Sequence, residues 1–138
     1  MRTTFLILLL AFCGFATSCD NDDDNGPQTE VSLEGTWDLK NISGGFAGIN
    51  ADFEDDAIEW TFNEETSVLT INNTHPNDDE TIYDGLESGT YTYELSTVDG
   101  ENQIYINDVF FGVYVLSASE LVIDQDIGAD GYVFSFER

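Results

Sequence analysis

From Leu33 to Arg138 the chain alternates apolar and polar residues in short runs, which turn-forming residues separate. In residues 58–63 and 90–95, every second side chain is apolar. A period of two is typical of β-strands, because successive side chains point to opposite faces of a sheet. Eight such runs are expected, over residues 35–42, 57–63, 67–72, 89–96, 103–107, 110–117, 120–125 and 131–137.

The connections between most of these runs are short, so successive strands are expected to pair as antiparallel neighbours. Asp99-Gly100 and Asn107-Asp108 have the composition of tight hairpin turns. An even number of strands with one apolar face is most simply closed into a barrel, since closure removes exposed strand edges. The sequence therefore predicts an all-β domain at residues 33–138, an eight-stranded antiparallel up-and-down β-barrel.

The side chains expected to point into this barrel and to line its open end are mostly large aromatics. They are Trp60, Phe62, Tyr91, Tyr93 and Phe111. A barrel of eight strands is just wide enough to be filled by its own side chains or to hold one small ligand. Because each buried aromatic side chain occupies so much of that space, both a hollow and a filled interior stay open.

The run at residues 110–117 breaks the alternation, because both of its faces are apolar. Phe111, Val113 and Val115 share the face expected to point inward. The face expected to point outward comprises Phe110, Tyr114 and Leu116, with Tyr105 of the neighbouring run beside them. An apolar outer wall needs a cover. One candidate is the connection at residues 43–56, where Phe46, Ile49 and Phe53 have the spacing of a short amphipathic helix that could also be a lid. The alternative cover is a second subunit or another protein.

Residues 1–18 have the organisation of a secretory signal peptide, with Arg2 ahead of an apolar run and small residues before Cys19. Ala16 and Cys19 resemble the lipobox of bacterial lipoproteins, in which the signal peptide is cut before a cysteine that carries lipid. This resemblance implies a protein of the bacterial cell envelope, anchored to a membrane, most simply the outer membrane, through Cys19. The apolar run is too short for a spanning helix.

Residues 19–32 are predicted to be a lipidated cysteine followed by a disordered acidic tether, because no apolar residue lies between Cys19 and Val31. Such an acidic run resembles the export tag that sends some lipoproteins to the outward face of the outer membrane. The whole chain carries 28 acidic and 3 basic residues, a formal net charge of −25. Nucleic acid is excluded as a partner, since binding to phosphates needs a cationic surface.

The sequence predicts no enzyme. His75 is the single histidine, it lies in a polar connection, and nothing resembles a nucleophile elbow. Cys13 and Cys19 are taken up by the signal peptide and the lipid, so no thiolate metal site is expected. No cofactor is expected beyond weak calcium binding at acidic loops, where carboxylate oxygens cluster.

A more specific pattern joins the two ends of the predicted barrel. Gly35-Thr36-Trp37 opens the first run, and Arg138 closes the last one. Together with an eight-strand meander, this pattern resembles the lipocalins, and most closely the short lipocalin-like domains of bacterial lipoproteins. The resemblance implies that Gly35, Trp37 and Arg138 close one end of the barrel, with Trp37 beneath the guanidinium group of Arg138.

Two functions from different classes fit these features. The first is a lipid-anchored envelope protein that binds a small apolar or amphipathic ligand in the barrel mouth. The second is a filled barrel that acts as a protein-interaction or inhibitor module through its apolar outer face. An enclosed apolar cavity of more than about 300 Å³ would favour the first hypothesis.

Overall fold

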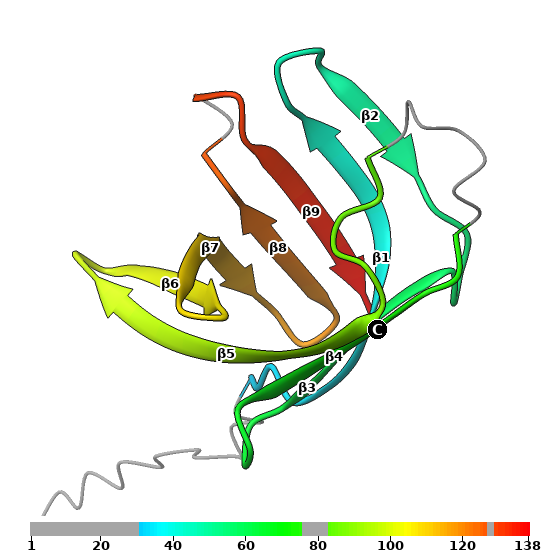
Figure 1. Ribbon diagram of the computed structural model, residues 1–138. Coiled ribbons are helices and arrows are strands. Elements are labelled where there is room, and N and C mark those ends of the chain that lie inside the picture. The colour runs from blue at the N-terminus through cyan, green and yellow to red at the C-terminus, as the bar shows by residue number, and fades with distance from the viewer. Residues whose placement is uncertain (1–30, 76–82, 127–128) are drawn as a thin grey trace, which may run out of the picture.

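The computed structural model describes residues 31–75, 83–126 and 129–138 (Figure 1). These residues form nine antiparallel strands, of which eight close into a barrel, and the predicted fold class is confirmed. The strands are β1 (Gly35–Gly44), β2 (Ile49–Asp52), β3 (Ile58–Asn63), β4 (Val68–Asn73), β5 (Gly89–Val98), β6 (Glu101–Ile106), β7 (Val109–Leu116), β8 (Glu120–Asp124) and β9 (Tyr132–Glu137). All eight predicted runs agree with a strand to within two residues at each end, and β2 is the one strand of the described residues that no run predicted.

The barrel is a meander from β3 to β9 that β1 closes by pairing with both ends. Trp37 of β1 pairs with Trp60 of β3, and Leu39 of β1 pairs with Phe136 of β9. In Figure 1 the C-terminal strand accordingly lies beside β1. Asp99 and Gly100 both have positive φ, as do Asn107 and Asp108, which fits the tight turns expected at these hairpins.

The predicted helix in the connection after β1 is wrong, because this segment forms a β-hairpin. Its second strand, β2, pairs with the distal half of β1, while β3 pairs with the proximal half. Phe46 lies in the hairpin turn and is 92% exposed, so it covers nothing. Ile49 packs against the core from the side, and Phe53 is buried in the core with its ring edge-on to His75. The i, i+3, i+7 spacing was misleading because two of these residues lie on or after a short strand.

The outward placement of Tyr114 and Leu116 is also wrong. The pairing of β6 with β7 shifts by one residue between Ile104 and Tyr105, which is a β-bulge. Because the period of a strand is two, one extra residue exchanges the faces of everything after it. Tyr114 and Leu116 therefore pack against the core, as does Phe111, whereas Phe110 is exposed.

Three sequence predictions lie outside the described residues. They are the signal peptide at residues 1–18, the lipidation site Cys19 and the part of the tether up to Glu30. Within the described part of the chain, no helix is long and apolar enough to cross a membrane.

Candidate functional site

The barrel interior is packed around one indole ring. The centroid of the Trp60 ring lies 5.0 Å from Phe136, 5.6 Å from Phe111, 6.1 Å from Phe134 and 6.2 Å from Phe62. Phe62 in turn meets Tyr93 edge-on at 5.2 Å. Such distances are those of rings in contact. Four of the five predicted lining residues thus form one continuous aromatic cluster that occupies the middle of the barrel.

Tyr91, the fifth predicted lining residue, lies apart from these ring contacts. It is half-buried against the core, and its hydroxyl donates a hydrogen bond of 2.9 Å to the carbonyl oxygen of Glu87. Its hydroxyl group is therefore already paired within the chain.

Two donors inside the barrel have no hydrogen-bond partner among the residues that the structure describes. They are the indole Nε1 of Trp60 and the hydroxyl of Tyr93, which is 6% exposed. Burial, with a smaller contribution from the charges of Glu64 and Glu34, raises the pKa of Tyr93 to about 12. The phenol is therefore neutral at physiological pH, and within the described part of the chain neither group has an acceptor in reach.

Residues 83–86, in the last part of the connection between β4 and β5, lie over one end of the barrel. Tyr83 stacks on Tyr132 with the ring centroids 4.3 Å apart. A Cβ at Gly85 would lie 3.3 Å from the Phe134 ring and 3.6 Å from Ile42, so this backbone rests directly on the core. The segment that covers this end in the described structure is thus residues 83–86, not the predicted lid at residues 43–56.

The opposite end of the barrel is closed around Trp37. The guanidinium carbon of Arg138 lies 4.0 Å from the centroid of the Trp37 ring, the contact that the lipocalin-like pattern implies. Arg138 also donates hydrogen bonds to the carbonyl oxygens of Ala118, Glu34 and Ser32. Trp37 Nε1 donates to the carbonyl of Leu33 at 2.9 Å. Gly35 begins β1 at this point, with a φ of 106° that suits glycine. These contacts are structural.

The outer wall carries an apolar groove of about 510 Å³ across β6, β7 and β8, which we call the wall groove. Its floor consists of Val113 and Val115, which the bulge turns outward, together with Phe110 and Val122, and Gln103 lies at one side. Val115 is 70% exposed and Phe110 is 46% exposed. Tyr105 flanks the floor with its ring 5.6 Å from that of Phe110 and its hydroxyl bonded to Gln103. Nothing in the described chain covers this wall.

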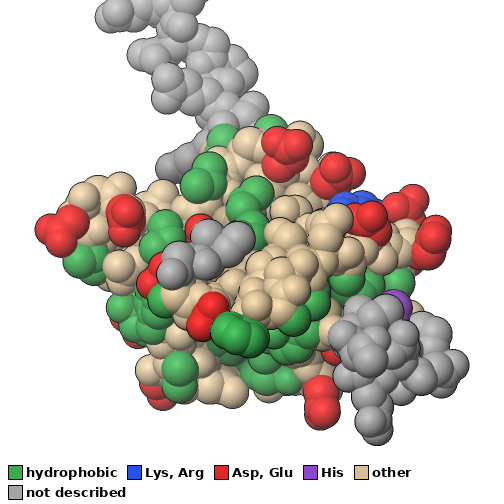
Figure 2. Space-filling model, turned by 90° about the horizontal axis from the view of Figure 1, so that it is seen from above, with side chains coloured by type: hydrophobic (Ala, Val, Ile, Leu, Met, Phe, Trp, Pro, Cys, Tyr) green, Lys and Arg blue, Asp and Glu red, His purple; other side chains and the backbone are tan. Residues whose placement is uncertain are grey.

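Carboxylates border the wall groove on both sides. Glu101 of β6 lies on one side, and Asp124 of β8 and Asp126 just beyond it lie on the other. This distribution continues over the molecule. Figure 2 shows the red of Asp and Glu spread around the face seen from above, whereas the blue of Lys and Arg is confined to a small area.

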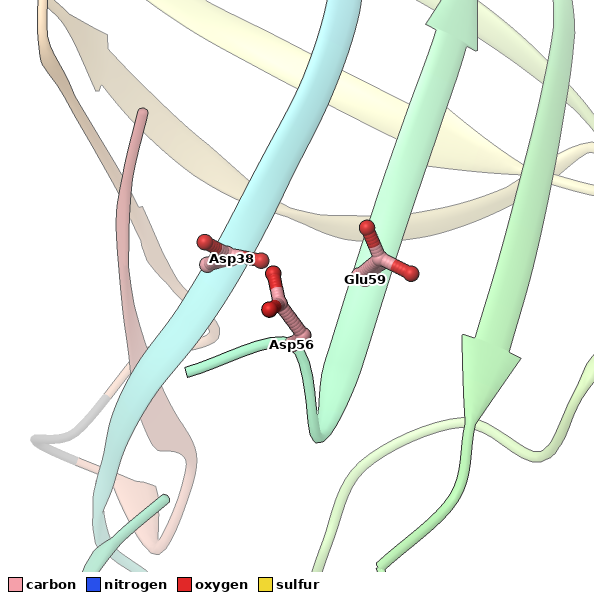
Figure 3. Close-up of side chains that lie close together, drawn as sticks. All are labelled: Asp38, Asp56 and Glu59. Atoms are coloured by element: carbon pink, nitrogen blue, oxygen red, sulfur yellow. The ribbon is translucent and has the colours of Figure 1, made fainter. Parts of the chain in front are cut away.

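Carboxylates also gather near the closed end, at Asp38, Asp56 and Glu59, with ligand oxygens within 4.8 Å of one another (Figure 3). Lys40 next to them pairs with Asp55 at 2.6 Å and with Asp38 at 3.5 Å. The hydrogen bond from Lys40 lowers the pKa of Asp55 and raises that of Lys40. Since these groups are exposed or half-buried and a lysine already supplies a cation, we infer no metal site from them.

No protein-family model, curated protein or solved structure matches this chain. The closed eight-stranded antiparallel barrel is consistent with a lipocalin-like fold, and this consistency rests on the strand topology alone.

The sequence pattern predicted an interior position for Trp60, Phe62, Tyr93 and Phe111, where the structure also places them, but it divided the residues of β7 wrongly between the two faces. Val113 and Val115 were expected to point inward, and the structure places them on the wall groove. The available signal was Gly112, a small residue in an otherwise bulky run, because glycine inside a strand often marks a bulge.

Proposed function

We propose that this chain is a membrane-tethered binding protein whose barrel presents the wall groove to a protein partner. The observation that carries the proposal is the contrast between a middle filled by aromatic rings and an outer wall that leaves Phe110 and Val115 exposed. Exposed apolar patches bordered by polar residues are characteristic of interaction sites. The proposal assigns the chain no catalytic role.

The same proposal includes the N-terminal features of the sequence. The signal peptide would direct export, and lipid on Cys19 would hold the barrel at an envelope membrane, with residues 20–32 as a spacer. A net charge of −25 supports a partner that is not nucleic acid. Replacement of Cys19 by Ser should release the protein from the membrane fraction, and retention there would contradict the anchor.

Site-specific photo-crosslinking in the producing cell tests the groove. A photoreactive residue at position 115 is expected to give a discrete protein adduct, and the substitution Phe110→Ser should abolish it. The matched control is the same residue at position 46, which is still more exposed but lies in the β1–β2 turn. Equal adducts from both positions, or none from position 115, would contradict the proposal.

A small ligand in the barrel is the second candidate, and the unpaired donors of Trp60 and Tyr93 favour it. A ligand with an acceptor oxygen could satisfy one of them, provided that the rings around Trp60 move apart. Uptake of the neutral fluorescent probe Nile red, whose carbonyl oxygen is an acceptor, tests this function. Fluorescence enhancement that Trp60→Phe removes and Phe110→Ser leaves intact would support the interior site, and an absence of enhancement would exclude it for this probe class.

A further inference from the structure

The wall groove has a charge pattern that narrows the choice of partner. Its apolar strip lies on β7 and the adjoining face of β8, and carboxylate side chains flank it on the β6 side and on the β8 side. The matching surface is therefore an apolar stripe with cationic groups along both margins. A second copy of this chain does not offer such a surface, because it carries only 3 basic residues against 28 acidic ones.

The backbone around the groove excludes strand addition as the mode of binding. β6 pairs with β5 and β7, β7 with β6 and β8, and β8 with β7 and β9. Since these three strands have no free edge beneath the groove, a partner has to bind through side chains. An α-helix presents side chains at i, i+3, i+4 and i+7 as one stripe, which suits a shallow apolar strip on a sheet face.

We propose that the occupant of the wall groove is an amphipathic, positively charged helix of a partner protein. This inference rests on the proposed function and adds the chemistry of the partner. Phe110, Val113 and Val115 take the apolar stripe of the helix, while Glu101 and Asp126 face its Lys or Arg margins. Charge attraction of this kind steers association and weakens as salt increases.

The test measures binding of labelled peptides of about 14 residues to the full chain by fluorescence anisotropy. The main probe is a Leu/Lys peptide with all leucines on one helical face. A Leu/Gln peptide has the same apolar face without charge, and a scrambled Leu/Lys peptide has the same charge without the face. We expect the amphipathic Leu/Lys peptide to bind at least tenfold more tightly than either of the others.

Variants of the protein locate the site. The pair Phe110→Ser with Val115→Ser should weaken binding of the Leu/Lys peptide at least tenfold, whereas Phe46→Ser should leave it unchanged. The pair Glu101→Gln with Asp126→Asn should weaken it about threefold to tenfold and reduce its salt dependence. Glu54→Gln with Glu65→Gln, which removes the same charge from exposed positions elsewhere, should have less than a twofold effect.

The outcomes distinguish two claims, that the wall groove is a binding site and that its partner is positively charged. If the Leu/Gln peptide binds as tightly as the Leu/Lys peptide and both need Phe110 and Val115, the cationic partner is overturned while the wall groove remains a binding site. If the Leu/Lys peptide binds equally well to the variant that lacks both apolar side chains, the groove itself is overturned. A doubled mass in solution that the same variant abolishes would identify a second copy as the occupant and overturn the inference.

Discussion

Arg138 joins two segments that are distant in sequence, the turn after β7 and the residues before β1. Its guanidinium group combines hydrogen bonds to three carbonyl oxygens with the ring contact to Trp37. Cation–π contacts and charged hydrogen bonds are each worth on the order of 1 kcal/mol at such partly exposed sites. We predict that Arg138→Ala lowers the free energy of unfolding in urea by about 2 kcal/mol.

Lys40→Ala is the matched control for Arg138→Ala, because it also removes one positive charge from a strongly acidic chain. Lys40 makes only ion pairs near the surface, so its loss is expected to cost less than about 1 kcal/mol. Equal losses in the two variants would show that Arg138 acts through net charge alone and not through its directed contacts.

Removal of the buried Tyr93 hydroxyl is expected to raise the free energy of unfolding, whereas removal of the Arg138 side chain lowers it. A buried hydroxyl without a partner lacks the hydrogen bonds that water gives it in the unfolded chain. Tyr93→Phe should therefore stabilise the protein at pH 7 by up to about 1 kcal/mol. Tyr91→Phe is the control, because the Tyr91 hydroxyl donates to Glu87, and its loss should destabilise by about 0.5 to 1 kcal/mol. Destabilisation by both variants would mean that the Tyr93 hydroxyl has a partner in solution.

The same residue predicts how stability changes in alkali. The pKa of Tyr93 is about 12 in the folded protein and about 10 in the unfolded chain. Below pH 10 the phenol is neutral in both states, so its ionisation does not reduce the free energy of unfolding there. Between pH 10 and 12 the unfolded chain loses the proton and the folded chain keeps it, and stability falls by up to about 1.4 kcal/mol per pH unit. Urea titrations at several pH values should show a shallower fall in Tyr93→Phe, and parallel curves would contradict this assignment.

At the scale of elements, the bulge in β7 decides which side chains reach the wall groove. Gly112 follows the bulged residue and is buried, and a Cβ there would lie 2.6 Å from the carbonyl oxygen of Asp124. Because that oxygen belongs to the backbone of the neighbouring strand, it cannot simply turn away. We predict that Gly112→Ala costs about 1 to 3 kcal/mol in urea unfolding.

Gly89 provides the comparison for Gly112, since it is also a strand glycine and its nearest contact would be 3.4 Å from a side-chain atom of Tyr91. Gly89→Ala is expected to be neutral to within about 0.5 kcal/mol. If Gly112→Ala is equally neutral, β7 does not hold the bulge tightly, and the face assignment of Val113 and Val115 loses its support.

Strand existence could be predicted because alternation is a local property, as Ile58, Trp60 and Phe62 illustrate. The bulge was harder to predict, because its one sign in the sequence is Gly112, and a single glycine does not show which residue is inserted. That insertion nevertheless exchanges the faces of every later position in β7. The strand β2 was not predicted either, because it has only four residues. Alternation over so short a segment cannot be distinguished from the helical spacing of Phe46, Ile49 and Phe53. Which residues line the wall groove depends on the register of β7, and that register is not a local property of the sequence.

At the scale of the whole molecule, the excess of carboxylates opposes the compact state. A net charge of −25 concentrates like charges when the chain folds, and mobile ions screen that repulsion. We predict that raising NaCl from about 10 mM to about 100 mM, which shortens the screening distance from about 30 Å to about 10 Å, moves the urea midpoint upward. An unchanged or lower midpoint would contradict self-repulsion as a significant destabilising factor.

The nature of the cation distinguishes this screening from specific binding. Screening depends on ionic strength, so CaCl2 and NaCl matched in ionic strength should stabilise to similar extents. A carboxylate cluster that bound calcium would add a stabilisation that grows with calcium concentration and that a chelator removes. The substitution Asp56→Asn would then abolish the excess, because Asp56 belongs to the cluster of Asp38 and Glu59. Since these groups are exposed and Lys40 lies beside them, we expect no such excess and equal curves for the variant and the wild type.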